Sequence, residues 1–179
     1  MPTTWSLRPL AESDGDILRA ATLVNVNWTG EERFMAADVD ARPDFRHYVE
    51  LRPARGDFGV VAESPGSEPH SSSAVQASAA EVAVAGAAWL VFLGADDPGY
   101  GFVAAGVPEL SITVWPDYRG HGIGRALLTA VLAEAAARGI AGVSLSVESG
   151  NPAVHLYRSV GFVPVPGAAD GTYVVRLAR

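Results

Sequence analysis

Three glycines within five residues, Gly120, Gly122 and Gly124, follow a predicted strand in the stretch ITVWPDYRGHGIGRALL. They fall in the expected first turn of the next helix, where each glycine costs about 1 kcal/mol relative to Ala. Glycines there let a ligand approach the main chain, and a helix start supplies unpaired N–H groups and the positive end of the helix dipole. Arg119 and Arg125 flank the glycines. The stretch therefore predicts a cradle for a phosphate-bearing ligand.

Two common phosphate-binding motifs do not fit this stretch. The P-loop requires a Lys, and the 13 cationic residues of this sequence are all Arg. The dinucleotide fingerprint G-x-G-x-x-G requires a third glycine at position 125, which is Arg. A purely structural role for the glycines, in which they allow close packing of the helix on the strand, is the remaining alternative.

A third pattern does fit. The residues Arg119-x-x-Gly122-x-Gly124 match the R/Q-x-x-G-x-G/A motif of the GCN5-related N-acetyltransferases (the GNAT family). The segment NPAVHLYRSVGF, residues 151–162, resembles the family's second signature, which is an Asn, a Leu-Tyr pair and a Gly-Phe pair. The two signatures lie about thirty residues apart, as in the family. From about Val82 to Val163 the chain thus resembles a GNAT acetyltransferase of bacterial type, whereas its N-terminal helices resemble the family only in their order.

The resemblance implies a site for acetyl-CoA between two strands. In this family the strand at 109–115 splays from the strand at 142–148, and the pantetheine arm bonds to the main chain of the first strand. A bulge there would direct one N–H to the thioester carbonyl, and the N–H groups from Gly120 to Arg125 would hold the pyrophosphate. The residues expected to bind the cofactor are Ile112, Thr113, Val114, Arg119, Gly120, His121, Gly122, Ile123, Gly124, Arg125 and Asn151. A helix N-cap is an equal alternative for Asn151.

The resemblance also assigns two catalytic residues. Tyr157 would hydrogen-bond or protonate the departing coenzyme A thiolate, whose pKa is about 8.5; the alternative is a packing role with its hydroxyl bonded elsewhere. Glu109 is the best-placed carboxylate to take the proton of the acceptor amine, and the alternative is a solvated charge at a strand end. Glu148 on the neighbouring strand is a second candidate base. Ser146 stands where some relatives carry their Glu.

The acceptor site is expected to be shaped by residues Asn25–Arg42 and Pro164–Thr172, neither of which contains an interpretable motif. Residues 61–118 carry seven acids and no base, which favours a cationic amine such as a polyamine, an aminoglycoside-like compound or a peptide N-terminus. The aromatic residues that either line this site or belong to the core are Trp28, Trp89 and Phe92, with Tyr48, Tyr100 and Phe102 expected in the core.

Alternating strand and helix signals position these residues in a single domain of residues 1–179. Strands are predicted at 5–10, 58–63, 82–93, 109–115, 142–148 and in the closing segments FVPV and TYVVRLA. Helices are predicted from a capping box at Ser13 and Asp16, over Thr29–Asp40, over Phe45–Leu51, from Gly120 to Arg138, and from an N-cap at Asn151 to Gly161. Residues 64–80, rich in Ser, Ala and Pro, are expected to form a flexible loop between two strands. The fold class is α/β or α+β, and the family resemblance implies a mixed, mostly antiparallel sheet of about six or seven strands flanked by helices.

Composition excludes several other classes. The absence of Cys removes disulfides and a cysteine acyl-enzyme, and the 4 scattered His residues predict no metal site. A net charge of −7 argues against nucleic acid as a partner. Since neither a signal peptide nor an apolar run of about 18 residues is present, a cytoplasmic protein without membrane association is expected.

The predicted function is acetyl transfer from acetyl-CoA to a primary amine of a small molecule or peptide, by direct attack in a ternary complex. The alternative is a catalytically silent domain of the same fold that binds or senses acyl-CoA. Because dimers are common in the family, a homodimer is a further expectation.

Overall fold

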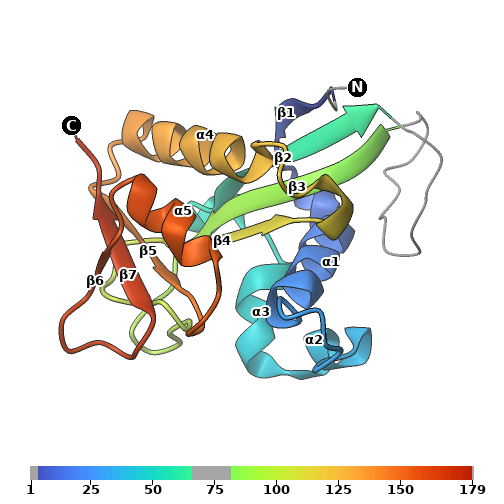
Figure 1. The fold of residues 1–179 in the computed structure, drawn as a ribbon. Coiled ribbons are helices and arrows are strands. Elements are labelled where there is room, and N and C mark those ends of the chain that lie inside the picture. Colours follow the sequence, from blue (N-terminus) through green and yellow to red (C-terminus); the bar gives the residue numbers. More distant parts are fainter. Residues whose placement is uncertain (1–3, 66–81, 179) are drawn as a thin grey trace.

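A computed structural model of the chain describes residues 4–65 and 82–178 (Figure 1). Its centre is a seven-stranded sheet with the strand order β1-β2-β3-β4-β5-β7-β6. The strands are β1 (Ser6–Pro9), β2 (Phe58–Pro65), β3 (Val82–Val91), β4 (Glu109–Val114), β5 (Gly142–Ser146), β6 (Val163–Pro164) and β7 (Thr172–Arg176). Of the predicted loop at 64–80, Ser64 and Pro65 end β2, and the rest lies outside the described residues.

Strands β4 and β5 form the parallel pair of this sheet, and they touch only briefly. Their register consists of Glu109 opposite Ser144, and the other neighbouring strands pair in antiparallel fashion. Beyond this contact the two strands diverge. The predicted fold class, a mixed and mostly antiparallel sheet with one splayed pair, is confirmed.

Helices cover both faces of the sheet. Figure 1 shows α1 (Gly15–Val26), α2 (Ala36–Ala41) and α3 (Pro43–Val49) on one side, and α4 (Ile123–Ala137) and α5 (Ala153–Ser159) on the other. Side chains of β3 alternate between the two layers, as a strand buried on both faces requires. Trp89 and Val91 pack in the core with α1 and α3, whereas Ala88 and Leu90 pack in the core with α4. The divergence of β4 and β5 therefore opens between two well-packed layers.

The predicted helix over Thr29–Asp40 is wrong in its first half, because residues 27–35 form turns and α2 begins only at Ala36. The side chain of Asn27 holds these turns. Its Oδ1 accepts the N–H groups of Arg33 at 2.9 Å and Phe34 at 3.0 Å, and its Nδ2 donates to the Phe34 carbonyl at 2.8 Å. Such side-chain bonds to the backbone compete with helix formation. The turns bring residues 28–34 toward the open end of the sheet.

The predicted capping box at Ser13 and Asp16 is also wrong. Asp14 caps a short turn instead, since its Oδ2 accepts the N–H of Ala11 at 2.8 Å. A 3₁₀ turn over Glu12–Asp14 follows, and α1 begins at Gly15. The helix itself lies where the apolar spacing placed it, with Ile17, Leu18 and Ala21 buried.

Asp57, with 2% of its surface exposed, joins the turn before β2 to the end of β3. It accepts the N–H groups of Arg52 at 3.0 Å and Phe92 at 2.9 Å, and it pairs with Arg55 at 2.6 Å. Asp57→Ala leaves these donors unpartnered, so we expect the free energy of unfolding in urea to fall by about 3–5 kcal/mol. The control Asp16→Ala, at a side chain 91% exposed, should change it by less than about 0.5 kcal/mol. Equal losses in both variants would contradict this role for Asp57.

Candidate active site

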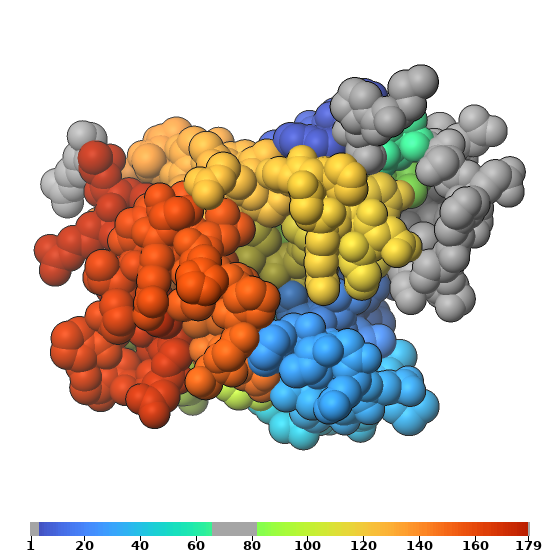
Figure 2. Space-filling model, viewed as in Figure 1, coloured from blue at the N-terminus to red at the C-terminus, as the bar shows by residue number. Residues whose placement is uncertain are grey.

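A pocket of about 600 Å³ opens where β4 and β5 diverge. Figure 2 shows the hollow between the orange segment around α5, the yellow segment that follows β4, and the blue N-terminal helices. The pocket is lined by α1 and the turns after it, by α3, by β4, by the end of β5 and by the start of α5. It therefore collects side chains from both halves of the sequence.

The main chain of β4 faces this opening at alternate residues. The register with β3 is regular from Glu109 opposite Val91 to Val114 opposite Gly86, and the Trp115 N–H donates to the Ala85 carbonyl. In an antiparallel ladder the bonded pairs alternate, so the N–H and C=O groups of Ile112 and Val114 point away from β3, toward β5. An extended ligand can add to this edge.

The regular register corrects two expectations for β4. The predicted bulge is wrong, because no residue of β4 is inserted between Glu109 and Val114. The main chain of Thr113 is directed to β3, and its hydroxyl donates within the protein, to the Ala21 carbonyl at 3.0 Å or to Asn25 Oδ1. Thr113 lines the pocket but serves to hold α1 on β4.

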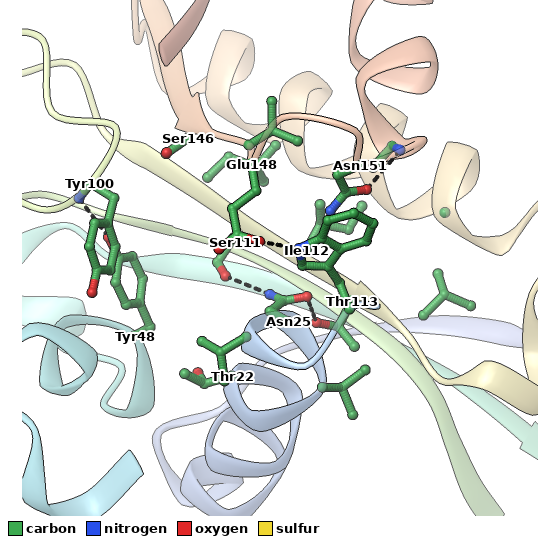
Figure 3. A pocket seen from close by; sticks show the side chains of 18 of the residues that line it. Thr22, Asn25, Tyr48, Tyr100, Ser111, Ile112, Thr113, Ser146, Glu148 and Asn151 are labelled. Carbon is green, nitrogen blue, oxygen red and sulfur yellow. Dashed lines mark hydrogen bonds between the residues drawn. The ribbon is translucent and has the colours of Figure 1, made fainter. Parts of the chain in front are cut away.

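Asn25 is the centre of a polar network on the floor of the pocket (Figure 3). Besides accepting from Thr113, its amide donates to Ser111 Oγ at 3.1 Å. Ser111 thus uses a lone pair toward Asn25 and keeps its own proton for another acceptor. Asn25 and Ser111 both line the pocket, and no motif in the sequence pointed to either of them as a site residue.

The glycine turn lies between β4 and α4. Gly120 and Gly122 adopt left-handed φ angles of +81° and +80° ahead of the helix, which begins at Ile123. Only Gly124 lies in the first helical turn, so the expectation that all three do is wrong. A Cβ at Gly120 or Gly122 would meet nothing within 4 Å. The turn thus presents an open surface beside the first N–H groups of α4, which have no intrahelical acceptor.

The remaining predicted phosphate-site residues surround this turn in different ways. Arg119 lines the pocket, and its Nε donates to the Val114 carbonyl at 3.2 Å. His121 and Arg125 are exposed, whereas the side chain of Ile123 is buried in the core. Only the main chain of Ile123 is therefore available to a ligand.

Tyr157 lines the pocket from α5. Its ring packs edge-on against Phe162 at 5.9 Å, and burial raises the pKa of its hydroxyl to about 12. No hydrogen bond joins this hydroxyl to another residue within the described ranges. The alternative in which the hydroxyl is bonded elsewhere therefore finds no support, and a phenol with this pKa keeps its proton at neutral pH.

Glu109 is buried, with 4% of its surface exposed, so the alternative of a solvated strand-end charge is wrong. Its Oε1 accepts the Tyr48 hydroxyl at 2.8 Å and the Gly101 N–H at 2.9 Å. Within the described residues its Oε2 has no hydrogen-bond partner. Burial raises the pKa of this carboxyl, and the two hydrogen bonds to Oε1 oppose the rise. A buried carboxylate with a bare oxygen has the properties of a general base.

Glu148 makes a bridge across the pocket (Figure 3). From the segment after β5 it accepts the Trp28 indole N–H, and it pairs with Arg33 at 3.1 Å. The hydrogen bond from Trp28, followed by that from Arg33, lowers the pKa of Glu148. Because the pKa of Glu148 is lowered whereas that of Glu109 is raised, Glu148 is the weaker base of the two. Ser146 lines the pocket beside this bridge.

Of the two predicted roles of Asn151, the structure supports the one at the start of the helix, whereas contact with the cofactor stays a prediction. Its Oδ1 accepts the Ala153 N–H at 2.9 Å, which caps α5, and the helix accordingly begins at Ala153 rather than at Pro152. Asn151 also lines the pocket. The side-chain amide of Asn151 is thus available to a ligand while its oxygen holds the helix.

The expected acceptor residues are only partly brought together. Trp28 lines the pocket, whereas Trp89 is fully buried beneath α1 and Phe92 packs on the α4 side of the core. Among the described residues of 164–172, none lines the pocket. Besides Trp28 and Tyr157, the aromatic residues that line it are Phe34, Phe45, Tyr48 and Tyr100.

No helix within residues 4–65 and 82–178 is long and apolar enough to cross a membrane. In the same two ranges, no group of three or more His, Asp or Glu side chains is placed to hold a metal ion.

Known proteins share this fold and the segment that carries both signatures. Residues 78–164 match the family model described as Acetyltransferase (GNAT) domain. An acetyltransferase of the GNAT family from Staphylococcus aureus Mu50 is 16% identical, with 98% of this chain and 100% of that chain covered and a TM-score of 0.64. A GNAT family acetyltransferase from Brucella melitensis in complex with acetyl-CoA is 20% identical, with 99% and 90% covered and a TM-score of 0.58. The PaiA N-acetyltransferase from Thermoplasma acidophilum in complex with coenzyme A is 16% identical, with 98% and 99% covered and a TM-score of 0.60.

The chain therefore has the fold of GNAT-family structures and carries a segment that matches the family's acetyltransferase domain. No curated protein matches the sequence. The resemblance found in the two sequence signatures is thus confirmed.

Proposed function

We propose that this protein transfers an acetyl group from acetyl-CoA to a primary amine, by direct attack within a ternary complex. The observation that carries the proposal is that one pocket of about 600 Å³ is lined both by the open edge of β4 and by Glu109 and Tyr157. Family neighbours crystallised with acetyl-CoA or coenzyme A support the choice of donor.

The residues present fit acetyl-CoA. The N–H and C=O groups of Ile112 and the N–H group of Val114 would bond the pantetheine arm at the edge of β4. The open turn at Gly120 and Gly122 and the first N–H groups of α4 would hold the pyrophosphate. Arg119, at the junction of these two parts, would add a positive charge next to the phosphates.

Acetyl-CoA supplies the acetyl group: the amine nitrogen bonds to the thioester carbonyl carbon as the C–S bond breaks. The acylated nitrogen then loses its excess proton to the departing thiolate, which gives the N-acetylated amine and coenzyme A. Glu109 takes a proton from the amine, directly or through a water, because only the neutral amine has a free electron pair. Tyr157 donates its hydroxyl hydrogen bond where the thiolate departs. A phenol of pKa about 12 is a weaker acid than a thiol of pKa about 8.5, so Tyr157 keeps its proton. It therefore stabilises the thiolate by a hydrogen bond.

The test is the release of coenzyme A from acetyl-CoA in the presence of a mixture of primary amines, with the acetylated product identified by mass spectrometry. Amine-dependent release with one new product 42 mass units heavier than its amine, roughly the mass that one transferred acetyl group adds, supports the proposal. Saturable binding of acetyl-CoA without transfer to any amine would instead support a silent acyl-CoA-binding domain.

Gly122→Ala should weaken acetyl-CoA binding about tenfold. The φ of +80° strains any side chain there by roughly 1–2 kcal/mol, and relaxing it would displace the N–H groups beside the phosphates. Gly139→Ala is the matched control: it lies at the other end of α4 with a φ of +76°, and its Cβ also meets nothing within 4 Å. Both variants should lose similar stability on heating, but only Gly122→Ala should show weaker calorimetric binding. Equal affinities in the two variants would contradict the phosphate site.

A further inference from the structure

Aromatic rings line the end of the pocket next to α3. Tyr48 of α3 and Tyr100 of the segment before β4 stack with ring centroids 6.2 Å apart and planes 5° from parallel (Figure 3). Phe34 and Phe45 meet edge to face with centroids 5.2 Å apart. All four residues line the pocket. Flat faces of this kind bind flat apolar groups better than they bind strongly hydrated ones.

These rings are held in place by contacts outside the pocket. The Tyr100 hydroxyl donates to Asp44, which pairs with Arg42 at 2.9 Å. The guanidinium of Arg42 lies over the rings of Phe34 and Phe45, 5.2 Å and 4.8 Å from their centroids. A wall fixed before the ligand arrives loses little side-chain freedom on binding, which favours affinity.

Charge at the pocket is almost fully compensated. Of the charged residues that line it in the described ranges, Glu148 and Arg33 pair with each other, and Arg119 lies at the glycine turn on the Val114 carbonyl. Glu109 is left without a cationic partner, and it lies next to the aromatic rings because the Tyr48 hydroxyl donates to it. The acceptor end thus offers one carboxylate and an apolar wall.

We propose that the acceptor is an arylalkylamine, a primary amine joined by a short alkyl arm to a flat aromatic group. This inference rests on the proposed acetyl transfer. The aromatic group lies against Phe34, Phe45, Tyr48 and Tyr100, and the amine is directed to Glu109. One proton passes from the amine to Glu109, and the nitrogen then forms the new C–N bond with the acetyl carbon as the C–S bond breaks. A second proton passes from this nitrogen to the departing thiolate, which leaves as coenzyme A.

The same arrangement disfavours two other classes of acceptor. A polyamine brings a second cationic centre, and the pocket has no second unpaired carboxylate within the described residues to receive it. An amino acid brings a carboxylate, and the guanidinium of Arg33 is already occupied by Glu148 and the Val26 carbonyl. Of the described acids in residues 61–118, Glu109 alone lines the pocket. The acidic character of that segment is therefore no guide to the acceptor.

The test compares 2-phenylethylamine with phenylalanine, which adds a carboxylate, and with putrescine, which replaces the ring by a second amine. Calorimetry first measures acetyl-CoA binding, then the binding of each amine to protein saturated with coenzyme A, and kinetics give kcat/KM with acetyl-CoA. We expect 2-phenylethylamine to bind at least tenfold more tightly than the others and to have the highest kcat/KM.

Variants at the wall give an independent readout. Phe34→Leu, which keeps an apolar side chain, is expected to weaken 2-phenylethylamine binding about tenfold and to leave acetyl-CoA affinity unchanged. Met35→Leu, at an adjacent residue 63% exposed and outside the pocket lining, is the matched control and should change neither.

The outcomes separate this inference from the proposed function. Failure of acetyl-CoA to bind overturns the acetyl-transfer proposal and the inference with it. Normal acetyl-CoA binding with putrescine or phenylalanine as the preferred acceptor overturns only the arylalkylamine assignment. Normal acetyl-CoA binding without binding or acetylation of 2-phenylethylamine overturns it as well.

Discussion

Glu109→Gln is expected to lower kcat for acetyl transfer by about 10²–10⁴-fold, the range that a general base contributes. Gln keeps the shape of the side chain and an oxygen that can accept the hydrogen bonds of Tyr48 and Gly101, but it cannot take a proton from the amine. Steady-state kinetics measure the loss. The affinity for acetyl-CoA, measured by calorimetry, should remain within about twofold of the parent's, because the substitution is not expected to change the ground-state binding of the cofactor.

Whereas kcat is expected to fall, the thermal stability of the Glu109→Gln variant is expected to stay equal or to rise. Burial raises the pKa of Glu109 above its ordinary 4.5, so the folded protein binds this proton more tightly than the unfolded chain does. The stability linked to the neutral form is complete below the unfolded pKa and is lost as the pH rises through the raised folded pKa. At neutral pH the variant should therefore melt at the same or a higher temperature than the parent, and the difference should vanish toward pH about 4.

Glu134→Gln is the matched control for this experiment. Glu134 is on the exposed side of α4, paired with Arg138 at 2.8 Å, and its loss should leave kcat and the melting temperature unchanged. Full activity in Glu109→Gln, together with a large loss in Glu148→Gln, would transfer the role of base to Glu148 and contradict the assignment of Glu109.

Tyr157→Phe is expected to lower kcat by about 10²-fold or more while leaving acetyl-CoA affinity unchanged. The substitution removes only the hydroxyl, which bonds no other described residue, and it keeps the packing of the ring against Phe162. Because the pKa of Tyr157 is raised to about 12, the parent enzyme should show no loss of kcat from this group up to pH about 10.

Tyr173→Phe provides the comparison for Tyr157→Phe. Tyr173 is equally buried, at 8% exposure, in the same core, but its hydroxyl accepts from Arg158 at 2.9 Å and it does not line the pocket. Its variant should retain kcat. If both variants retain it, the hydroxyl of Tyr157 takes no part in the reaction.

The parts of this site that the sequence predicted are local. The strand at 109–114, the glycine turn and the cap at Asn151 each depend on neighbours within a few residues, so periodicity and turn chemistry are sufficient to place them. The position of Tyr157 on a helix follows from the helix-start signal at Asn151 and Pro152, whereas its expected role came from the family resemblance. The left-handed φ angles of Gly120 and Gly122 were not expected, because a run of glycines fits both a helix start and the turn before it.

The parts that the sequence did not predict depend on contacts between distant segments. Tyr48, Tyr100 and Glu109 meet although they lie up to 61 positions apart, and Tyr48 was expected only as core. Trp28 and Glu148 meet across 120 positions. The side chain of Asn27 prevents the first half of the predicted helix over Thr29–Asp40 by bonding to the main chain of Arg33 and Phe34. Apolar periodicity does not reveal such bonds. The aromatic wall of the pocket therefore could not be predicted from local patterns, whereas the glycine turn between β4 and α4 could.

The most direct test of the central claim is a calorimetric titration of the purified protein with acetyl-CoA, with free coenzyme A as the comparison. It requires no knowledge of the acceptor. We expect saturable binding of both ligands at one site per chain, weakened by Gly122→Ala and unaffected by Gly139→Ala. Absence of binding by both ligands would contradict the assignment of the pocket between β4 and β5 to acetyl-CoA.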